Sequence, residues 1–258
     1  MVCTIRNFTL SRSLSSVSRA DTCCAILLRE KPSLKPLLLP NLGESAIPGF
    51  TIGDLKDRLY ALTKSSDLSR KIIYIWLRLR YLTELLESIP DKNSSAIDDM
   101  FFTDKIDFIE RHTLSVLHLD SLAECSAVEF LTAFLNASLV YIYEELRECP
   151  KWTNVCMCLS QRIRSGLQVV NQASVIRHCP DLLLWILLLG RSGNSPLGEP
   201  GRLWYSNLIA HVEENLQIKV PAVVSGLRYF ELAEETRPNG SPSRAKSENK
   251  GPVKDEAG

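Results

Sequence analysis

The stretch CPDLLLWILLLGR, residues 179–191, decides the fold of this chain. Its unbroken apolar run from Leu182 to Leu189 suits a buried strand or a buried helix, and the periodicity of the run does not separate the two. Leu and Trp dominate the run where Val and Ile would favour a strand, and the sequence has no other candidate for a parallel strand. The sequence therefore predicts a core helix that begins at Pro180 and ends at Gly190.

Helical patterns continue on both sides of this core helix. A capping box over residues 51–54 predicts a short helix over 55–63, because its Thr hydroxyl and Asp carboxylate satisfy the first amide groups. Pro90, Pro150 and Gly166 are expected to end three of the other helices. The remaining predicted helices cover residues 67–89, 103–116, 121–148, 154–165, 203–216 and 221–235.

This pattern predicts an all-α protein, an irregular bundle of about seven to eight helices with disordered termini. Pro and Gly are frequent over residues 31–50, and the end of the chain is polar. We therefore expect a flexible N-terminal segment at 1–40, one helical domain at 41–235 and a disordered tail at 236–258.

The composition excludes several classes of protein. The chain has 258 residues, its 30 Lys and Arg are balanced by 30 Asp and Glu, and 45% of its residues are hydrophobic. These values are ordinary for a globular protein and exclude collagen-like, coiled-coil and wholly disordered chains. A zero net charge argues against a strongly basic nucleic-acid-binding protein. The longest apolar run has eight residues, far below the roughly 20 that cross a bilayer, so no membrane partner is expected.

Eight cysteines are too few for the disulfide framework of a small secreted domain. The first 20 residues lack the apolar core of a secretory leader, which favours free and mostly buried thiols in a reducing compartment. The same 20 residues contain Arg6, Arg12 and Arg19 without an acidic residue, a composition typical of a mitochondrial presequence. A mitochondrial location therefore stays open as an alternative.

No motif points to catalysis, a cofactor or a metal ion. The cysteines form no C-x2-C pair, so zinc ligands at the usual spacing are absent, and no glycine-rich phosphate loop occurs. Ser192 follows Gly190 as in a nucleophile elbow, but Asn194 stands where that motif requires glycine. We expect no catalytic, cofactor-binding or metal-ligating residues; a small helical enzyme that uses His178 and Cys179, or Ser192, is the alternative.

One predicted helix mixes basic and aromatic side chains in a way that suits two roles. Interleaved cations and rings can form a stacking platform for nucleic-acid bases, but the same helix carries many Ile and Leu residues. We therefore favour a core helix with charged flanks. The basic and aromatic residues concerned are Arg70, Lys71, Tyr74, Trp76, Arg78, Arg80 and Tyr81.

The core helix and the segment after it together carry a family resemblance. An apolar helix rich in Leu and closed by glycine is followed, about a dozen residues later, by the helix start GRLWY at 201–205. This order is similar to the C-terminal half of the fungal-specific transcription factor domain, an all-helical regulatory region normally found downstream of a binuclear zinc cluster. The resemblance implies that five structural signature residues join the two helices, namely Trp185, Gly190, Arg202, Trp204 and Tyr205.

The six-cysteine, DNA-reading module of that family has no counterpart in this sequence. The resemblance therefore implies a regulatory-type helical domain that acts in transcription through protein contacts and does not read DNA itself. The expected partners are the transcription machinery or a complete regulator, with a small-molecule effector as a further ligand. The nucleus is the expected location, with the cytoplasm or the mitochondrion as alternatives. The alternative functions are the small helical enzyme and a mitochondrial helical protein of unknown activity.

Overall fold

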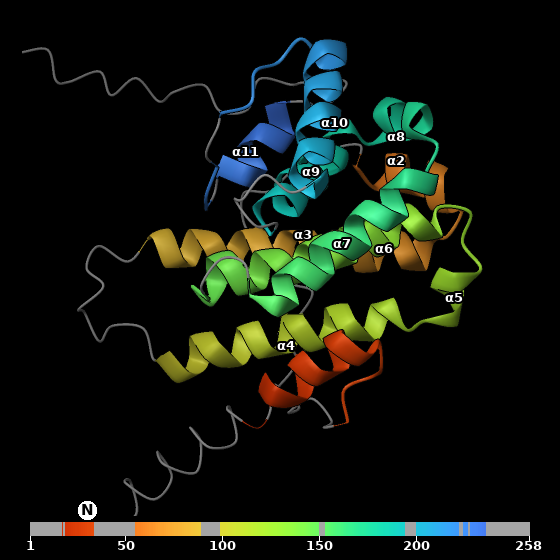
Figure 1. Cartoon of the computed structure of the whole chain (residues 1–258). Helices are drawn as coiled ribbons and strands as arrows, with labels where there is room; N and C mark the ends of the chain where they lie inside the picture. Colours follow the sequence, from red (N-terminus) through yellow and green to blue (C-terminus); the bar gives the residue numbers. More distant parts are fainter. Residues whose placement is uncertain are drawn as a thin grey trace, which may run out of the picture.

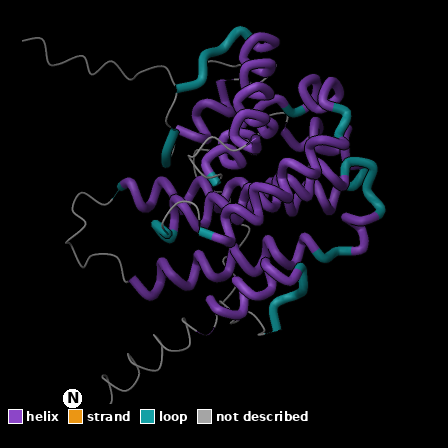
Figure 2. Tube along the Cα trace, viewed as in Figure 1, coloured by secondary structure: helices purple, strands orange, loops and turns teal. Residues whose placement is uncertain are grey.

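The computed structural model describes residues 17, 19–33, 55–88, 99–149, 153–193, 200–221, 224–226 and 228–235, and every regular element among them is helical (Figures 1 and 2). The predicted all-α fold is thereby confirmed. The capping box at 51–54, the helix ends at Pro90 and Pro150, and the tail at 236–258 lie outside the described residues.

The first helix in the described part of the chain covers residues 19–28, and we call it the N-terminal helix. It is followed by α2 (Leu55–Thr63), α3 (Ser66–Glu87), α4 (Asp99–Leu117), α5 (Asp120–Ala123), α6 (Val128–Tyr141), the π-helix η1 (Ile142–Leu146), α7 (Asn154–Val169), α8 (Gln172–His178), α9 (Pro180–Ser192), α10 (Pro200–Leu216) and α11 (Arg228–Glu235). In the view of Figure 1, α3, α6, α7 and α4 run along one another across the middle of the molecule. The N-terminal helix lies below α4, and α9, α10 and α11 pack together above.

Helix α9 forms the centre of the core, as the sequence predicts. All residues from Leu182 to Leu189 are buried within a single helix, so the strand alternative is wrong. Pro180 occupies the helix start, where its missing N–H group removes no hydrogen bond. In the first turn, buried Asp181 accepts two hydrogen bonds from the guanidinium of Arg58 in α2, both at 2.8 Å. This ion pair fastens α2 to the beginning of α9.

Around α9 the core is aromatic. Trp185 is fully buried, and its ring centroid lies 5.2 Å from that of Trp76 in α3 and 5.5 Å from that of Phe134 in α6. Phe230 of α11 completes this aromatic cluster at 4.9 Å from Trp76 and 5.9 Å from Trp185. Helices that are far apart in the sequence therefore share one core.

Gly190 was expected to end α9, but it lies inside the helix, which continues to Ser192. A Cβ atom at this position would lie 2.4 Å from Cε1 of the buried Tyr205 ring in α10. The Tyr205 hydroxyl donates to the carbonyl oxygen of Ser160 at 2.7 Å, and the Ser160 hydroxyl donates to that of Gly190 at 2.6 Å. The predicted helix end is therefore wrong, because this glycine allows the close approach of α9 and α10.

The two remaining signature residues lie nearer the surface. Trp204 is partly buried, and the guanidinium carbon of Arg164 lies 5.9 Å from its ring centroid. Arg202 lies on the exposed face of α10. Contact between the two signature helices therefore depends mainly on Gly190 and Tyr205.

The single helix predicted over 121–148 is wrong in its continuity, because the structure divides it into α5, α6 and η1. Between α5 and α6, the buried thiol of Cys125 donates to the carbonyl oxygen of Thr63 at 3.4 Å. At the other end the helix widens to π geometry, and the Arg147 N–H donates to the carbonyl oxygen of Ile142, five residues back, at 2.9 Å. Neither the tertiary contact of Cys125 nor the local π geometry leaves a mark on the helical periodicity.

Other differences concern helix ends and the number of helices. Helix α7 runs through Gly166, which was expected to end it, and α11 begins at Arg228 instead of residue 221. Helix α8 is too short to give a periodic signal, and with α5 it brings the described helical segments above the seven to eight expected.

The N-terminal helix lies within residues 1–40, where the sequence predicts a flexible segment. Its Ala25 and Ile26 are buried against the rest of the protein. Asp21 forms an ion pair with Arg111 of α4 at 3.2 Å. Within that segment, contacts with distant residues therefore hold the N-terminal helix against the rest of the protein.

Candidate functional site

A cavity of about 390 Å³ lies between the N-terminal helix, α4, α6 and α7. Its volume falls within the roughly 300–1,000 Å³ that is typical of small-molecule sites. Apolar lining comes from Ala25, Ile26, Leu114, Leu117, Leu139 and Val169. Polar lining comes from Arg29, His118, Glu129, Thr132, Asn136, Arg162 and Ser165. The cavity thus combines apolar walls with a few polar groups that could orient a bound molecule.

Gly166 brings α6 and α7 together beside this cavity. A Cβ atom at this position would lie 3.2 Å from the carbonyl oxygen of Glu129 in α6, closer than most side chains come. In α6, the side-chain amide of buried Asn136 donates to the carbonyl oxygen of Thr132 at 2.7 Å. The polar side of the cavity is therefore built on closely packed helices.

Arg162 of α7 is a half-buried cation whose hydrogen bonds are incomplete. Its Nη2 donates to the carbonyl oxygen of Leu27 at 3.2 Å, whereas its buried Nε has no hydrogen-bond partner. Burial lowers the pKa of this guanidinium and the charge on Arg29 lowers it further, although Cys158 has the opposite effect. Because Arg29 also lines the cavity, two positive charges favour an anionic ligand there.

The N-terminal helix closes one side of the cavity. Besides the bond from Arg162, Nε2 of His118 lies 3.0 Å from the carbonyl oxygen of Glu30, which follows this helix. The ion pair between Asp21 and Arg111 holds the beginning of the helix. Arg162 and His118 therefore line the cavity and at the same time contact the N-terminal helix or the residues that follow it.

A buried ion cluster lies where the N-terminal helix meets α4 and η1. Arg147 bonds to Asp107 and, at 2.5 Å, to Glu110, both in α4. Although burial alone would lower it, these carboxylates raise the pKa of Arg147 above its usual value. The Tyr143 hydroxyl donates to Glu110 at 2.6 Å and lies 3.3 Å from the Cys23 sulfur. Because its charged groups bind one another, we interpret the cluster as a structural anchor.

The structure places the two alternative sets of enzyme residues at opposite ends of α9. Cys179 is fully buried before α9, and Nδ1 of the adjacent His178 lies 2.8 Å from the carbonyl oxygen of Ser174. Ser192 lies at the other end of α9 and donates to the Glu144 carboxylate at 2.5 Å. The 13 residues of this helix separate the two sets by about 20 Å. The described residues contain no group of three His, Cys, Asp or Glu that could hold a metal ion.

The cysteines in the described part of the chain are all free thiols. Cys125, Cys156 and Cys179 are buried, whereas Cys24 is exposed. Burial raises the pKa of Cys156 to about 11. This thiol therefore stays protonated near neutral pH and packs as a small apolar side chain.

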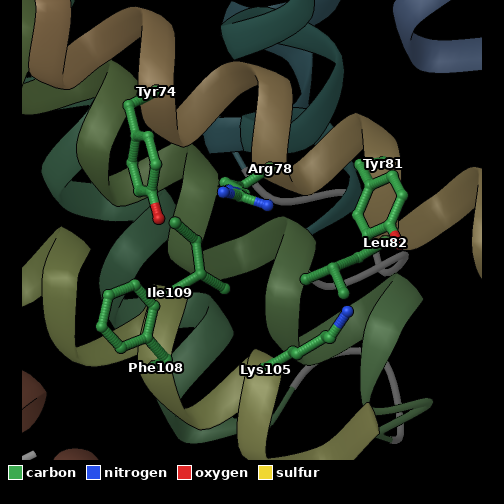
Figure 3. Close-up of a pocket in the computed structure, with 7 residues that line it drawn as sticks. All are labelled: Tyr74, Arg78, Tyr81, Leu82, Lys105, Phe108 and Ile109. Carbon is green, nitrogen blue, oxygen red and sulfur yellow. The ribbon is translucent and has the colours of Figure 1, made fainter. Parts of the chain in front are cut away.

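The basic and aromatic helix, α3, packs as a core helix with charged flanks. Trp76 belongs to the aromatic cluster, and Tyr74 and Tyr81 border a small cleft between α3 and α4 (Figure 3). The guanidinium carbon of Arg78 lies 5.1 Å from the Tyr74 ring centroid, and Nζ of Lys105 lies 5.2 Å from that of Tyr81. The cleft measures about 10 Å³, enough for about one water molecule. The rings thus face cations of the protein itself and leave little room for a stacked base.

Beside this cleft, His112 of α4 is enclosed by aromatic rings. Its ring stacks on Phe108 with centroids 6.1 Å apart and meets Tyr74 edge-on at 5.2 Å. Its Nε2 is buried without a hydrogen-bond partner. Burial, followed by the charge on Lys71, lowers the pKa of His112. The folded protein therefore favours the neutral imidazole.

Sequence reasoning missed the residues that shape the cavity. Arg162 and Asn136 lie on ordinary amphipathic or apolar helices, and no motif marks them. Gly166 is prominent in the sequence, but a glycine near the end of a periodic stretch predicts a helix end as well as a close packing contact.

No family model, no curated protein sequence and no solved structure matches this chain. The resemblance to the fungal-specific transcription factor domain therefore stays a prediction from the sequence. By length and composition, no single helix in the described segments could span a bilayer, although α8 and α9, bent at 118°, satisfy the same test as a pair.

Proposed function

We propose that this chain is a transcription-regulator-like helical interaction module that binds protein partners and does not read DNA itself. The observation that carries this proposal is the exposed apolar surface on the helix that closes the cavity. Leu27 and Leu28 of the N-terminal helix are 46% and 66% exposed, and Val169 at the end of α7 is 71% exposed. Val169 also lines the cavity, so the proposed partner surface and the effector site share an edge.

The N-terminal helix offers a link between an effector and a protein partner. Exposed apolar side chains that lie together mark protein contacts, because water is released when a partner covers them. Ala25 and Ile26, on the other face of the same helix, are buried and line the cavity. A molecule in the cavity would therefore contact the helix that presents Leu27 and Leu28. A regulatory domain requires such a link, in which an effector contacts the element that presents the partner surface.

Two further features support the regulator-like part of the proposal. The helices on which the family resemblance rests meet at Gly190 and Tyr205 and contribute to the core. The balanced charge of the chain offers no general attraction to phosphates, which favours protein partners over DNA. We propose the transcription machinery or a complete regulator as the partner, and the nucleus as the location.

A tethering assay tests this proposal. The full chain is fused to a heterologous DNA-binding domain, and expression of a reporter gene next to the matching operator is measured. We expect the fusion to change reporter expression and Leu28→Glu to abolish the change, because a partner would have to desolvate the new carboxylate. Leu203→Glu is the matched control, since Leu203 is 64% exposed but lies on α10, far from the N-terminal helix (Figure 1).

A fusion without any effect on the reporter would contradict the proposal, as would equal effects of the two Glu variants. Both variants should keep the thermal unfolding midpoint of the wild type, because each replaces an exposed side chain. A mobility-shift assay with the unfused chain tests the remaining claim. Tight, salt-sensitive binding to DNA would show that the chain has its own DNA contact.

A further inference from the structure

We infer that the cavity between the N-terminal helix, α4, α6 and α7 binds a small organic acid. Its carboxylate pairs with Arg162, and its apolar body lies against Leu117 and Val169, which line the cavity and keep apolar surface. This inference rests on the proposed function, because it names the chemical class of the effector that the regulatory module responds to.

Arg162 supplies the reason for a negative charge on the ligand. Its guanidinium lines the cavity, and its Nη2 donates to the carbonyl oxygen of Leu27. Arg29 lines the same cavity and adds a second positive charge. The planar guanidinium matches the two oxygens of a carboxylate, so an acid suits a cavity that two arginines line.

The lining also favours a ligand with one negative charge. Glu129 lines the same cavity and offsets one of the two positive charges of Arg29 and Arg162. A carboxylate makes the three side chains and the ligand neutral as a group, whereas a phosphate monoester, with roughly 1.5–2 negative charges near neutral pH, leaves a surplus of negative charge. A carboxylate, with a single charge, fits this balance better.

The apolar walls determine the rest of the ligand. Leu117 of α4 is partly buried and Val169 of α7 is 71% exposed, so both lining residues keep apolar surface that a ligand can cover. A hydrocarbon chain or ring gains from contact with such surface, whereas a sugar would leave hydroxyl groups without hydrogen-bond partners. The ligand is therefore an amphipathic acid.

Binding of the acid also affects the N-terminal helix. The same guanidinium that receives the carboxylate donates to the carbonyl oxygen of Leu27, and His118 contacts Glu30 at the edge of the cavity. A bound acid fixes Arg162 and with it the hydrogen bond to the Leu27 carbonyl oxygen. Hydrogen exchange of the backbone amides in the N-terminal helix should therefore slow when the acid binds.

Calorimetric titration of the full chain tests this inference with three probes that share one apolar body: octanoate, 1-octanol and octyl phosphate. We expect octanoate to bind about tenfold more tightly than 1-octanol, and octyl phosphate to bind more weakly than octanoate. Arg162→Gln should weaken octanoate about tenfold and leave 1-octanol unchanged. Arg164→Gln is the matched control on the same helix and should bind octanoate like the wild type, because Arg164 lies over Trp204 and does not line the cavity.

Equal affinities for octanoate and 1-octanol would overturn the role of Arg162, and tighter binding of octyl phosphate would overturn the choice of a carboxylate. No binding of any probe would overturn the site itself. The three-probe comparison uses the wild-type chain, so it holds even where Arg162→Gln fails to fold. Octanoate binding together with an inactive reporter fusion would reject the proposed function alone, whereas an active fusion without octanoate binding would reject this inference alone.

Discussion

Replacing Gly190 by alanine should destabilise the protein, although alanine is the better helix former. In an ordinary helix interior this exchange would stabilise by about 1 kcal/mol. Here the new methyl group would lie 2.4, 2.5 and 2.6 Å from Cε1, Cζ and the hydroxyl oxygen of Tyr205. The ring is fully buried and cannot turn into solvent, and such overpacking costs about 1–3 kcal/mol. A shift of the ring also weakens its 2.7 Å hydrogen bond to Ser160, at a cost of about 1 kcal/mol. We therefore expect Gly190→Ala to lower the free energy of unfolding by about 2 kcal/mol.

Urea unfolding followed by circular dichroism measures this change, and the thermal midpoint should fall by about 4–8 °C. Gly166→Ala is the matched control in another helix, since its nearest neighbour would lie at 3.2 Å, and its change should stay within about 1 kcal/mol of zero. The double variant Gly190→Ala with Tyr205→Leu should cost less than the sum of its parts, because the clash is removed. A fully stable Gly190→Ala variant, or simple additivity in the double variant, would refute this reasoning.

Further substitutions test other parts of the structure. Asp181→Ala should cost about 3 kcal/mol in urea unfolding, because it leaves the buried charge of Arg58 without its carboxylate; a cost near zero would contradict the buried ion pair. Trp185→Ala should cost about 3–5 kcal/mol, and Trp204→Ala clearly less because its ring is only partly buried; equal costs would argue against this difference in depth. His112→Leu should flatten the dependence of stability on pH. The pKa of this imidazole is lower in the folded state, so the wild type loses stability as the pH falls below about 6.5, and parallel curves for wild type and variant between pH 7 and pH 5 would reject this role.

The core helix α9 could be predicted because its signal is local. An apolar run that begins after Pro180 specifies burial without reference to any partner, and its Leu and Trp content favours a helix. Helices α2 and α3 were predictable for the same reason, and their bounds agree with the sequence expectation to within about two residues. Periodicity thus identifies helices that bury a regular stripe.

Other features depend on contacts between distant segments and leave little trace in the local pattern. The π-helix η1 precedes Arg147, which meets Glu110 of α4, and nothing in the sequence of 142–146 indicates this contact. The N-terminal helix becomes ordered by the burial of Ile26, although its surrounding composition predicts flexibility. The cavity also depends on contacts between distant segments, because Arg162 reaches Leu27 only in the folded protein.

The aromatic cluster cannot close on the ribosome until α11 has been synthesised. Trp76 is made well before Phe230, its neighbour at 4.9 Å. At roughly 5–20 residues per second, the nascent chain exposes Trp185 for seconds before α11 has been made. During that time an open aromatic surface is accessible to chaperones. The nascent chain covers this surface only after α11 has docked.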